Sequence, residues 1–253
     1  MHLPLSDALA PIRALDSVGS TNAELAERAS AAPEFATTLT TSQTSGKGRL
    51  GRTWIAPPGQ GLAVSVLLRP SFDGTLWGWL PLIAGLAMVR TVASLVPHRH
   101  DVTLKWPNDV LVDSRKISGI LLELLDDSSG VVVGAGLNLE FTHDTLPTPV
   151  STSLLLAGAT LRGDALVDAA FSTWFTHLRE LYLALGDTAN QVRDAVTRAC
   201  GTLGSRVRVE LPGRAELRGV ATDIDAIGRL VVQTDAGAVV AVAAGDVTHL
   251  RRE

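Results

Sequence analysis

Cysteine is almost absent from this sequence, and its scarcity excludes whole classes of protein. The chain of 253 residues contains one cysteine, Cys200. A single thiol cannot form an internal disulfide or a cysteine-rich metal site. The six histidines show no metal-ligand spacing, so we assign no metal ligands to protein side chains. Cys200 has no histidine close by in the sequence, and we expect it to be a small buried hydrophobic residue.

Long apolar runs are also missing. The apolar uncharged run at residues 74–89 is interrupted by Gly78, Pro81 and Gly85, and it is shorter than the roughly 20 apolar residues that cross a bilayer. The first residues, MHLPLSDALAPIR, lack the basic segment and apolar run of a signal peptide. We therefore predict a cytoplasmic protein with no membrane association.

Positive charge is not in excess. The formal net charge is -4, with 46% hydrophobic and 19% charged residues, which is typical of a globular protein. A negative chain has no general attraction for nucleic acid or for an anionic membrane. Any site for an anion must therefore be local.

Lysine is scarce relative to arginine. Of the 22 basic residues, three are lysines and 19 are arginines. Lys47, Lys105 and Lys116 each lie in a short polar stretch. Because lysine is a compact point charge that can follow a small anion during a reaction, we treat these three stretches as candidate sites.

What the sequence does contain is a basic, glycine-rich stretch at residues 42–54, SQTSGKGRLGRTW. Glycine permits close backbone approach, so several N–H groups can turn toward one anion while Lys47, Arg49 and Arg52 add charge. The stretch matches neither the P-loop nor the dinucleotide-binding pattern. Taken alone, it is equally typical of an exposed surface connection.

Hydrophobic patterning predicts a mixed α/β (α+β) fold. A helix is expected from Thr21 to about Ser30, with Thr21 and Glu24 forming a capping box. A buried helix is expected over 76–96, and further helices over 164–185 and 190–199. Strands are expected at 62–68, 102–105, 110–113, 117–125 and 131–141. Short turns join the last four strands and imply antiparallel pairing.

The pattern changes after Leu203. Short strand-like stretches follow without a helical period, separated by turns such as Pro212-Gly213, and they indicate a small β-barrel. We therefore predict an antiparallel-rich sheet flanked by helices over residues 1–202 and a β-barrel domain over residues 203–253.

Five short stretches of the sequence are not specific one by one, but together they indicate one kind of protein. They are STN at 20–22, GKGRLGRTW at 46–54, KWPNDV at 105–110 with RKISGILLE at 115–123, GAGLNL at 134–139, and TSLL at 152–155. In this order and spacing they resemble the signature stretches of biotin protein ligases. The resemblance covers nearly the whole chain, including a carboxy-terminal part that is similar to the family's SH3-like barrel and ends in GDVTHLR at 245–251.

The resemblance implies a class II synthetase-like catalytic domain and a reaction in two steps. The biotin carboxylate attacks the α-phosphorus of ATP, with Mg²⁺ on the phosphates, and yields biotinyl-5'-AMP and pyrophosphate. A lysine of a biotin carboxyl carrier protein then accepts the biotinyl group. The resemblance implies no tightly bound prosthetic group, no nucleic acid partner, and a monomer or weak homodimer.

The resemblance also assigns residues to this reaction. Biotin is expected to contact Ser20, Thr21, Asn22, Gln43, Gly46, Lys47, Gly48, Arg49 and Lys116. The nucleotide is expected to contact Arg52, Trp54, Lys105, Asn108, Asp109 and Asn138. The expected catalytic residues are Lys116 and Arg49, which stabilise the moving charge, and Asp109, which is a candidate acceptor for the proton of the attacking lysine.

One position departs from the family pattern. The usual form is Gly-Arg-Gly-Arg, and Lys47 replaces the first arginine here. A residue that acts through its backbone N–H tolerates this change, whereas a bidentate guanidinium contact would be lost. We favour the backbone role.

Three other functions compete with this interpretation. Lipoate protein ligase is the nearest, but the Lys-Trp-Pro-Asn-Asp and Gly-Lys-Gly-Arg stretches favour biotin. A transcriptional repressor needs a helix-turn-helix, and we expect the nineteen residues before Ser20 to be too few for three helices. A pure nucleotide-binding module would not release pyrophosphate when biotin and ATP are supplied.

Overall fold

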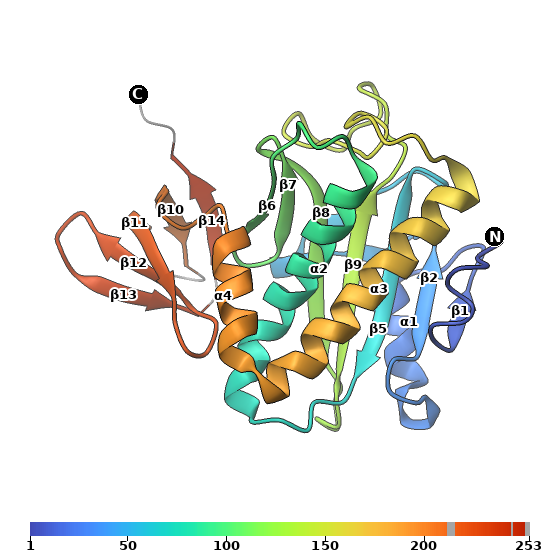
Figure 1. Ribbon diagram of the computed structural model, residues 1–253, viewed down its shortest axis with the longest axis horizontal. Helices are drawn as coiled ribbons and strands as arrows, with labels where there is room; N and C mark the ends of the chain where they lie inside the picture. Colours follow the sequence, from blue (N-terminus) through green and yellow to red (C-terminus); the bar gives the residue numbers. More distant parts are fainter. Residues whose placement is uncertain (212–215, 244, 251–253) are drawn as a thin grey trace.

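The computed structural model describes residues 1–211, 216–243 and 245–250. Its larger sheet has seven strands in the order β1-β2-β5-β9-β8-β7-β6 (Figure 1). They are β1 (Ile12–Ala14), β2 (Thr37–Thr40), β5 (Gly61–Leu68), β6 (Val102–Lys105), β7 (Asp109–Val112), β8 (Arg115–Leu124) and β9 (Val131–Asn138). Only β1 and β2 run parallel among the described neighbours. The predicted antiparallel-rich sheet is therefore confirmed.

Helices cover both faces of this sheet. Helices α2 (Leu80–Leu95) and α3 (Gly163–Asp187) lie across one face, and α4 (Ala189–Ala199) lies beside them toward the smaller sheet (Figure 1). Helix α1 (Thr21–Glu27) packs on the opposite face. Side chains alternate along a strand: Val64 and Val66 of β5 join the main core with α2 and α3, whereas Leu67 packs under α1.

Helix α2 starts later than the sequence pattern predicts. Residues Gly74–Trp79 form a 3-10 helix, and the α-helix begins at Leu80 with Pro81 in its first turn, where the missing N–H costs no helical bond. By length and composition, Gly74–Leu95 could cross a membrane, but 67% of its apolar window is buried inside the protein. The segment is the central helix of the core, packed between the sheet and α3.

The predicted capping box at the start of α1 is wrong. Ser20 is the N-cap, and its hydroxyl accepts a hydrogen bond from the backbone N–H of Ala23 at 3.4 Å. The Glu24 carboxylate points away from the helix end, where it pairs with Arg13 at 2.9 Å and accepts a hydrogen bond from Thr38. Partners on β1 and β2, which are distant in sequence, therefore outcompete the local cap.

A second, five-stranded sheet follows α4. It consists of β10 (Arg206–Glu210), β11 (Leu217–Ile224), β12 (Leu230–Thr234), β13 (Val239–Val242) and β14 (Asp246–His249), in the order β13-β12-β11-β10-β14 with antiparallel pairing. This agrees with the predicted SH3-like domain. The predicted turn at Pro212-Gly213 and residue Arg251 lie outside the described residues. The predicted boundary at residue 202 falls in the segment between α4 and β10.

The two sheets are joined by close packing at the turn between β11 and β12. The Trp79 Nε1–H donates to the Ala226 carbonyl at 3.0 Å, and the Trp106 Nε1–H donates to the Gly228 carbonyl at 3.1 Å. A Cβ atom on Gly78 would lie 2.1 Å from the Ile227 carbonyl oxygen. The backbones approach so closely that only glycine fits at position 78.

We predict that Gly78→Ala lowers the free energy of unfolding by about 1–3 kcal/mol, the usual cost of an added methyl group in a packed interior. Urea unfolding measures this loss. Gly74→Ala is the matched control, because no atom lies within 4 Å of a Cβ at position 74 of the same 3-10 helix. Equal unfolding midpoints for the two variants would show that the turn does not dock tightly at Gly78.

Candidate active site

A cavity lies on the face of the larger sheet that carries α1. Its floor includes small residues of three neighbouring strands, namely Ala63 of β5, Gly134 and Gly136 of β9, and Gly119 of β8. One end is bounded by the start of α1 and the other by β7 and Asp246 of the smaller sheet. Small residues lower the floor, so a ligand can approach the sheet backbone.

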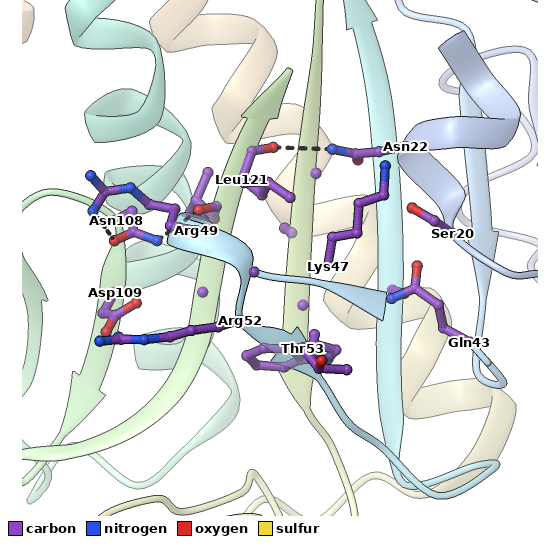
Figure 2. Close-up of a pocket in the computed structure, with 18 of the residues that line it drawn as sticks. Ser20, Asn22, Gln43, Lys47, Arg49, Arg52, Thr53, Asn108, Asp109 and Leu121 are labelled. Carbon is purple, nitrogen blue, oxygen red and sulfur yellow. Dashed lines mark hydrogen bonds between the residues drawn. The ribbon is translucent and has the colours of Figure 1, made fainter. Parts of the chain in front are cut away.

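A short hairpin crosses this cavity, where the sequence indicated only a loop (Figure 2). Strands β3 (Gly46–Lys47) and β4 (Thr53–Trp54) pair antiparallel, and residues Arg49–Gly51 form a 3-10 turn between them. Leu50 at the turn has φ 57° and is 58% exposed. A leucine rarely adopts this left-handed conformation, and this one lines the cavity while staying largely exposed.

Hydroxyl and amide groups gather at one end, which we call the amide end: Ser20, Thr21, Asn22 and Gln43. The Gln43 Oε1 accepts hydrogen bonds from the backbone N–H and the hydroxyl of Thr21, at 2.9 and 3.2 Å. The hydroxyl of buried Ser65 lies 2.8 Å from the Thr21 hydroxyl. A set of uncharged donors and acceptors suits a neutral polar group such as a cyclic urea.

Charged groups gather at the other end, which we call the cationic end: Arg49, Arg52, Lys116, Asp109 and Asp246. Lys116 on β8 pairs with Asp109 on β7, with 2.6 Å between Nζ and Oδ1. The Arg49 guanidinium on the hairpin donates to Asn108 Oδ1 at 3.2 Å and to the Gly245 carbonyl at 3.4 Å. Figure 2 shows Arg49, Arg52, Asn108 and Asp109 side by side at this end.

An ion pair between the hairpin and the smaller sheet closes the cationic end. Arg52 of the hairpin donates a hydrogen bond to the Asp246 carboxylate of β14. This bond lowers the pKa of Asp246 and raises the pKa of Arg52. Burial lowers the pKa of Arg49 and of nearby Lys105, although the negative charge of Asp109 opposes the shift in both cases. Three cations, Arg49, Arg52 and Lys116, therefore face two carboxylates in the lining of the cavity, an excess of positive charge that suits an anion.

The Trp54 indole lies between the two ends, directly over the sheet. A Cβ atom on Gly136 would lie 2.4 Å from the indole Cε2, and one on Gly119 would lie 3.4 Å from Cζ3. The Lys116 ammonium is 5.9 Å from the indole centroid. The two glycines make room for a flat aromatic surface beside the cations, which can stack against a base or an apolar chain.

Most residues that the sequence indicated line this one cavity. They are Ser20, Thr21, Asn22, Gln43, Lys47, Gly48, Arg49, Arg52, Trp54, Asn108, Asp109 and Lys116. Gly46, Lys105 and Asn138 do not line it. A Cβ on Gly46 would lie 2.5 Å from Gln43 Nε2, so Gly46 shapes the hairpin. Asn138 is buried and donates to the Thr152 carbonyl at 2.8 Å.

Sequence reasoning missed one charged residue that lines the cavity, Asp246, and two residues that contact its lining, Glu123 and Ser65. Asp246 belongs to the GDVTHLR stretch, which indicated only a barrel strand, and Glu123 ends the RKISGILLE stretch without an assigned role. Ser65 lies inside an apolar strand. Two of them, Asp246 and Glu123, lie within recognisable motifs. Their contacts with the hairpin and with α1 could not be predicted, because these contacts join segments that are distant in the sequence.

This architecture, with a helix-flanked sheet, a small carboxy-terminal sheet and a cavity under a glycine hairpin, defines a protein of the biotin and lipoate ligase class. Residues 15–138 match the model of the biotin/lipoate A/B protein ligase family. Residues 202–250 match the biotin protein ligase C terminal domain.

Comparison with similar proteins shows to which family within this class the chain belongs. A biotin--[acetyl-CoA-carboxylase] ligase of Mycobacterium tuberculosis is 40% identical over 249 residues, which cover 94% of this chain and 90% of that protein. The Paracoccus denitrificans protein of the same name is 30% identical, covering 86% and 92% of the two chains. This chain belongs to the biotin protein ligase family, which confirms the resemblance seen in its motifs.

Solved structures agree with this assignment. The fold matches the biotin protein ligase of Aquifex aeolicus in complex with biotin and ATP, with a TM-score of 0.78, 24% identity, and coverage of 95% of this chain and 99% of that chain. It also matches the Leishmania major biotin protein ligase in complex with biotinyl-5-AMP, with a TM-score of 0.58, 25% identity, and coverage of 92% and 98%. The predicted class of fold is therefore confirmed.

We predict that Asp246→Asn lowers the free energy of unfolding at pH 7 by less than about 1 kcal/mol, because the pair with Arg52 is partly exposed. The folded pKa of Asp246 is depressed, so the contribution is present above the unfolded value of about 3.9 and is lost as pH falls through the folded value. Denaturant unfolding from pH 7 into acid should show the two proteins converging. A difference that grows toward acid would contradict this ion pair.

Proposed function

We propose that this enzyme activates biotin with ATP as biotinyl-5'-AMP and transfers the biotinyl group to a lysine of a biotin carboxyl carrier protein domain. The observation that carries the proposal is one cavity in which a neutral amide end and a cationic end lie on either side of Trp54, whose indole covers Gly119 and Gly136. Relatives named as biotin--[acetyl-CoA-carboxylase] ligases support both the acid and the acceptor.

The two ends match the two ends of the proposed intermediate. The hydroxyl and amide groups of Ser20, Thr21 and Gln43 suit the uncharged ureido ring of biotin, which both donates and accepts hydrogen bonds. Arg49 and Lys116 suit the carboxylate and the α-phosphate. We place the apolar chain and the adenine base against the Trp54 indole.

The first step moves negative charge between two groups. A carboxylate oxygen of biotin bonds to the α-phosphorus, and the bond from that phosphorus to the bridging oxygen breaks, so pyrophosphate leaves with the electron pair. Charge builds on the α-phosphate oxygens in the transition state. Fixed cations that already face this point stabilise it without reorganisation. Lys116, held 2.6 Å from Asp109, is our first choice for this role, with Arg49 beside it.

The second step requires a neutral amine. The carrier lysine, with an ordinary pKa of about 10.4, loses a proton and attacks the acyl carbon, and AMP leaves. We retain Asp109 as the candidate acceptor of that proton. Asp109 is ion-paired with Lys116 in this structure. Accepting a proton would neutralise the Asp109 carboxylate and free Lys116 from the pair as AMP leaves.

The residues present are compatible with a Mg²⁺ ion that is held mainly by phosphate. Within the described residues, no three acidic or histidine side chains gather as a metal site, and Asp109 and Asp246 are the carboxylates that line the cavity. Mg²⁺ commonly uses one or two carboxylates together with phosphate oxygens. Asp109 and Asp246 would hold the ion, and it would neutralise phosphate charge when bound.

The competing functions receive less support. Lipoate ligation is not favoured, because the similar curated proteins that cover most of this chain are named as biotin ligases. A cytoplasmic location, a monomer or weak homodimer, and the absence of nucleic acid binding all stay predictions from the sequence. A domain boundary at residue 202 is also part of the proposal, and it is supported by the match of residues 202–250 to a separate carboxy-terminal domain.

We predict that Lys116→Ala slows formation of biotinyl-5'-AMP by about 100-fold or more, the usual cost of removing one group that stabilises a transition-state anion. Mass spectrometry after incubation with biotin, ATP and Mg²⁺ measures the adenylate. Arg115→Ala is the matched control, because this exposed neighbour is also a cation. Unchanged adenylate formation in a folded Lys116→Ala protein would exclude the catalytic role.

We predict that Asp109→Asn slows transfer from preformed biotinyl-5'-AMP by about 100-fold at pH 7, the usual contribution of a general base. The rate should then rise steeply with pH, because the carrier lysine must deprotonate in solution. Single-turnover transfer to a purified carrier domain from pH 6 to pH 9 tests this. A rate and pH profile equal to those of the wild type would exclude Asp109 as the proton acceptor.

A further inference from the structure

Glu123 is a carboxylate beside the amide end that the proposed reaction does not use. It lies near the end of β8, and its side chain is 35% exposed. Its Oε2 accepts a hydrogen bond from Asn22 Nδ2 at 2.7 Å, and its Oε1 lies 3.5 Å from Lys47 Nζ. One carboxylate therefore contacts both the start of α1 and the hairpin.

The amide of Asn22 is fully engaged in this arrangement. Its Oδ1 accepts a hydrogen bond from the Ser65 hydroxyl at 2.5 Å, and its Nδ2 also lies 3.4 Å from the Leu121 carbonyl. A Cβ on Gly134 would lie 2.2 Å from Asn22 Oδ1, so the side chain packs tightly on the sheet. Because an ionised carboxylate only accepts, Glu123 fixes which side of the amide faces it.

Lys47 uses its side chain for this contact. Figure 2 shows the side chain of Lys47 extending toward Asn22, at the opposite end of the cavity from Asp109. Its ammonium therefore adds no charge at the cationic end, although the residue sits two positions before Arg49. The side chain is 55% exposed, so its pair with Glu123 is accessible to water and is sensitive to salt.

We propose that Glu123 is a positioning residue that couples the hairpin to the order of the amide end. Through Lys47 it holds the hairpin across the cavity, and through Asn22 it holds the packing on which Thr21 and Gln43 rest. The inference builds on the proposed function, since biotin is the ligand whose retention it explains. It also gives a side-chain role to Lys47, for which the sequence favoured a backbone role.

The two contacts differ in expected strength. An exposed ion pair changes binding by about two- to fivefold, whereas a hydrogen bond to a charged group changes it by about tenfold or more. Glu123→Gln keeps an acceptor for Asn22 and loses the charge that pairs with Lys47. Glu123→Ala loses both contacts. Lys47→Met removes the charge while keeping the length of the side chain, and Lys47→Arg keeps the charge.

The experiment measures the affinity and the dissociation rate of biotin by calorimetry and stopped flow. We expect Glu123→Gln and Lys47→Met to raise the dissociation rate by about two- to fivefold each, and the double variant to do no more than either single change. We expect Lys47→Arg to behave as the wild type. Glu123→Ala should weaken affinity by about tenfold or more. High salt should raise the dissociation rate of the wild type but not that of Lys47→Met.

Two controls separate this inference from the proposed function. Glu180→Gln removes an exposed carboxylate on α3 and should leave biotin binding unchanged. Wild-type protein that binds no biotin would overturn the proposed function together with this inference. Additive effects in the double variant, or equal affinities for Glu123→Ala and the wild type, would overturn only the coupling. If Glu123→Ala fails to fold, the charge variants still decide the result.

Discussion

The separation of neutral and charged groups within one cavity is the constraint on which the rest of the structure depends. An anion needs fixed positive charge, whereas a neutral ring needs donors and acceptors that do not attract counterions. Here the start of α1 and the segment before the hairpin supply the uncharged groups, while the hairpin, β7 and β8 supply Arg49, Asp109 and Lys116. The sheet makes this possible because neighbouring strands present side chains on one face at fixed spacing. Glycine at Gly119 and Gly136 then clears space for Trp54 between the two ends.

The smaller sheet is part of this arrangement and not an independent appendage. Its β11–β12 turn packs against Trp79 and Trp106. Asp246, at the start of its last strand, contacts Arg52, and the carbonyl of the preceding residue, Gly245, contacts Arg49. The carboxylate orients Arg52 and the carbonyl orients Arg49 before any phosphate binds. Such preorganisation reduces the entropy that ordering would cost on binding.

Local patterns predicted much of the fold. The meander from β6 to β9 follows from apolar runs separated by short turns, and α3 follows from the helical spacing of its apolar stripe. Interactions between distant segments could not be predicted in the same way. The Thr21 capping box gave way to Ser20 because Glu24 found partners on β1 and β2. Most of the site residues that the motif resemblance predicted line one cavity in the structure. Lys105 and Asn138 were also predicted, but they do not line it. Asp246 could not be placed from the sequence because its partner Arg52 lies 194 residues earlier in the chain.

The central claim is that the hairpin and β8 place their cations on a single acyl-phosphate. A crystal structure of the protein with biotinyl-5'-AMP, or with a stable sulfamoyl analogue, tests it most directly. The account predicts Arg49 and Lys116 both within hydrogen-bond distance, about 2.7–3.2 Å, of the oxygens that join the two halves of the ligand, with the ring of biotin at Gln43. A ligand bound at another surface, or one that meets only one of these two cations, would contradict it.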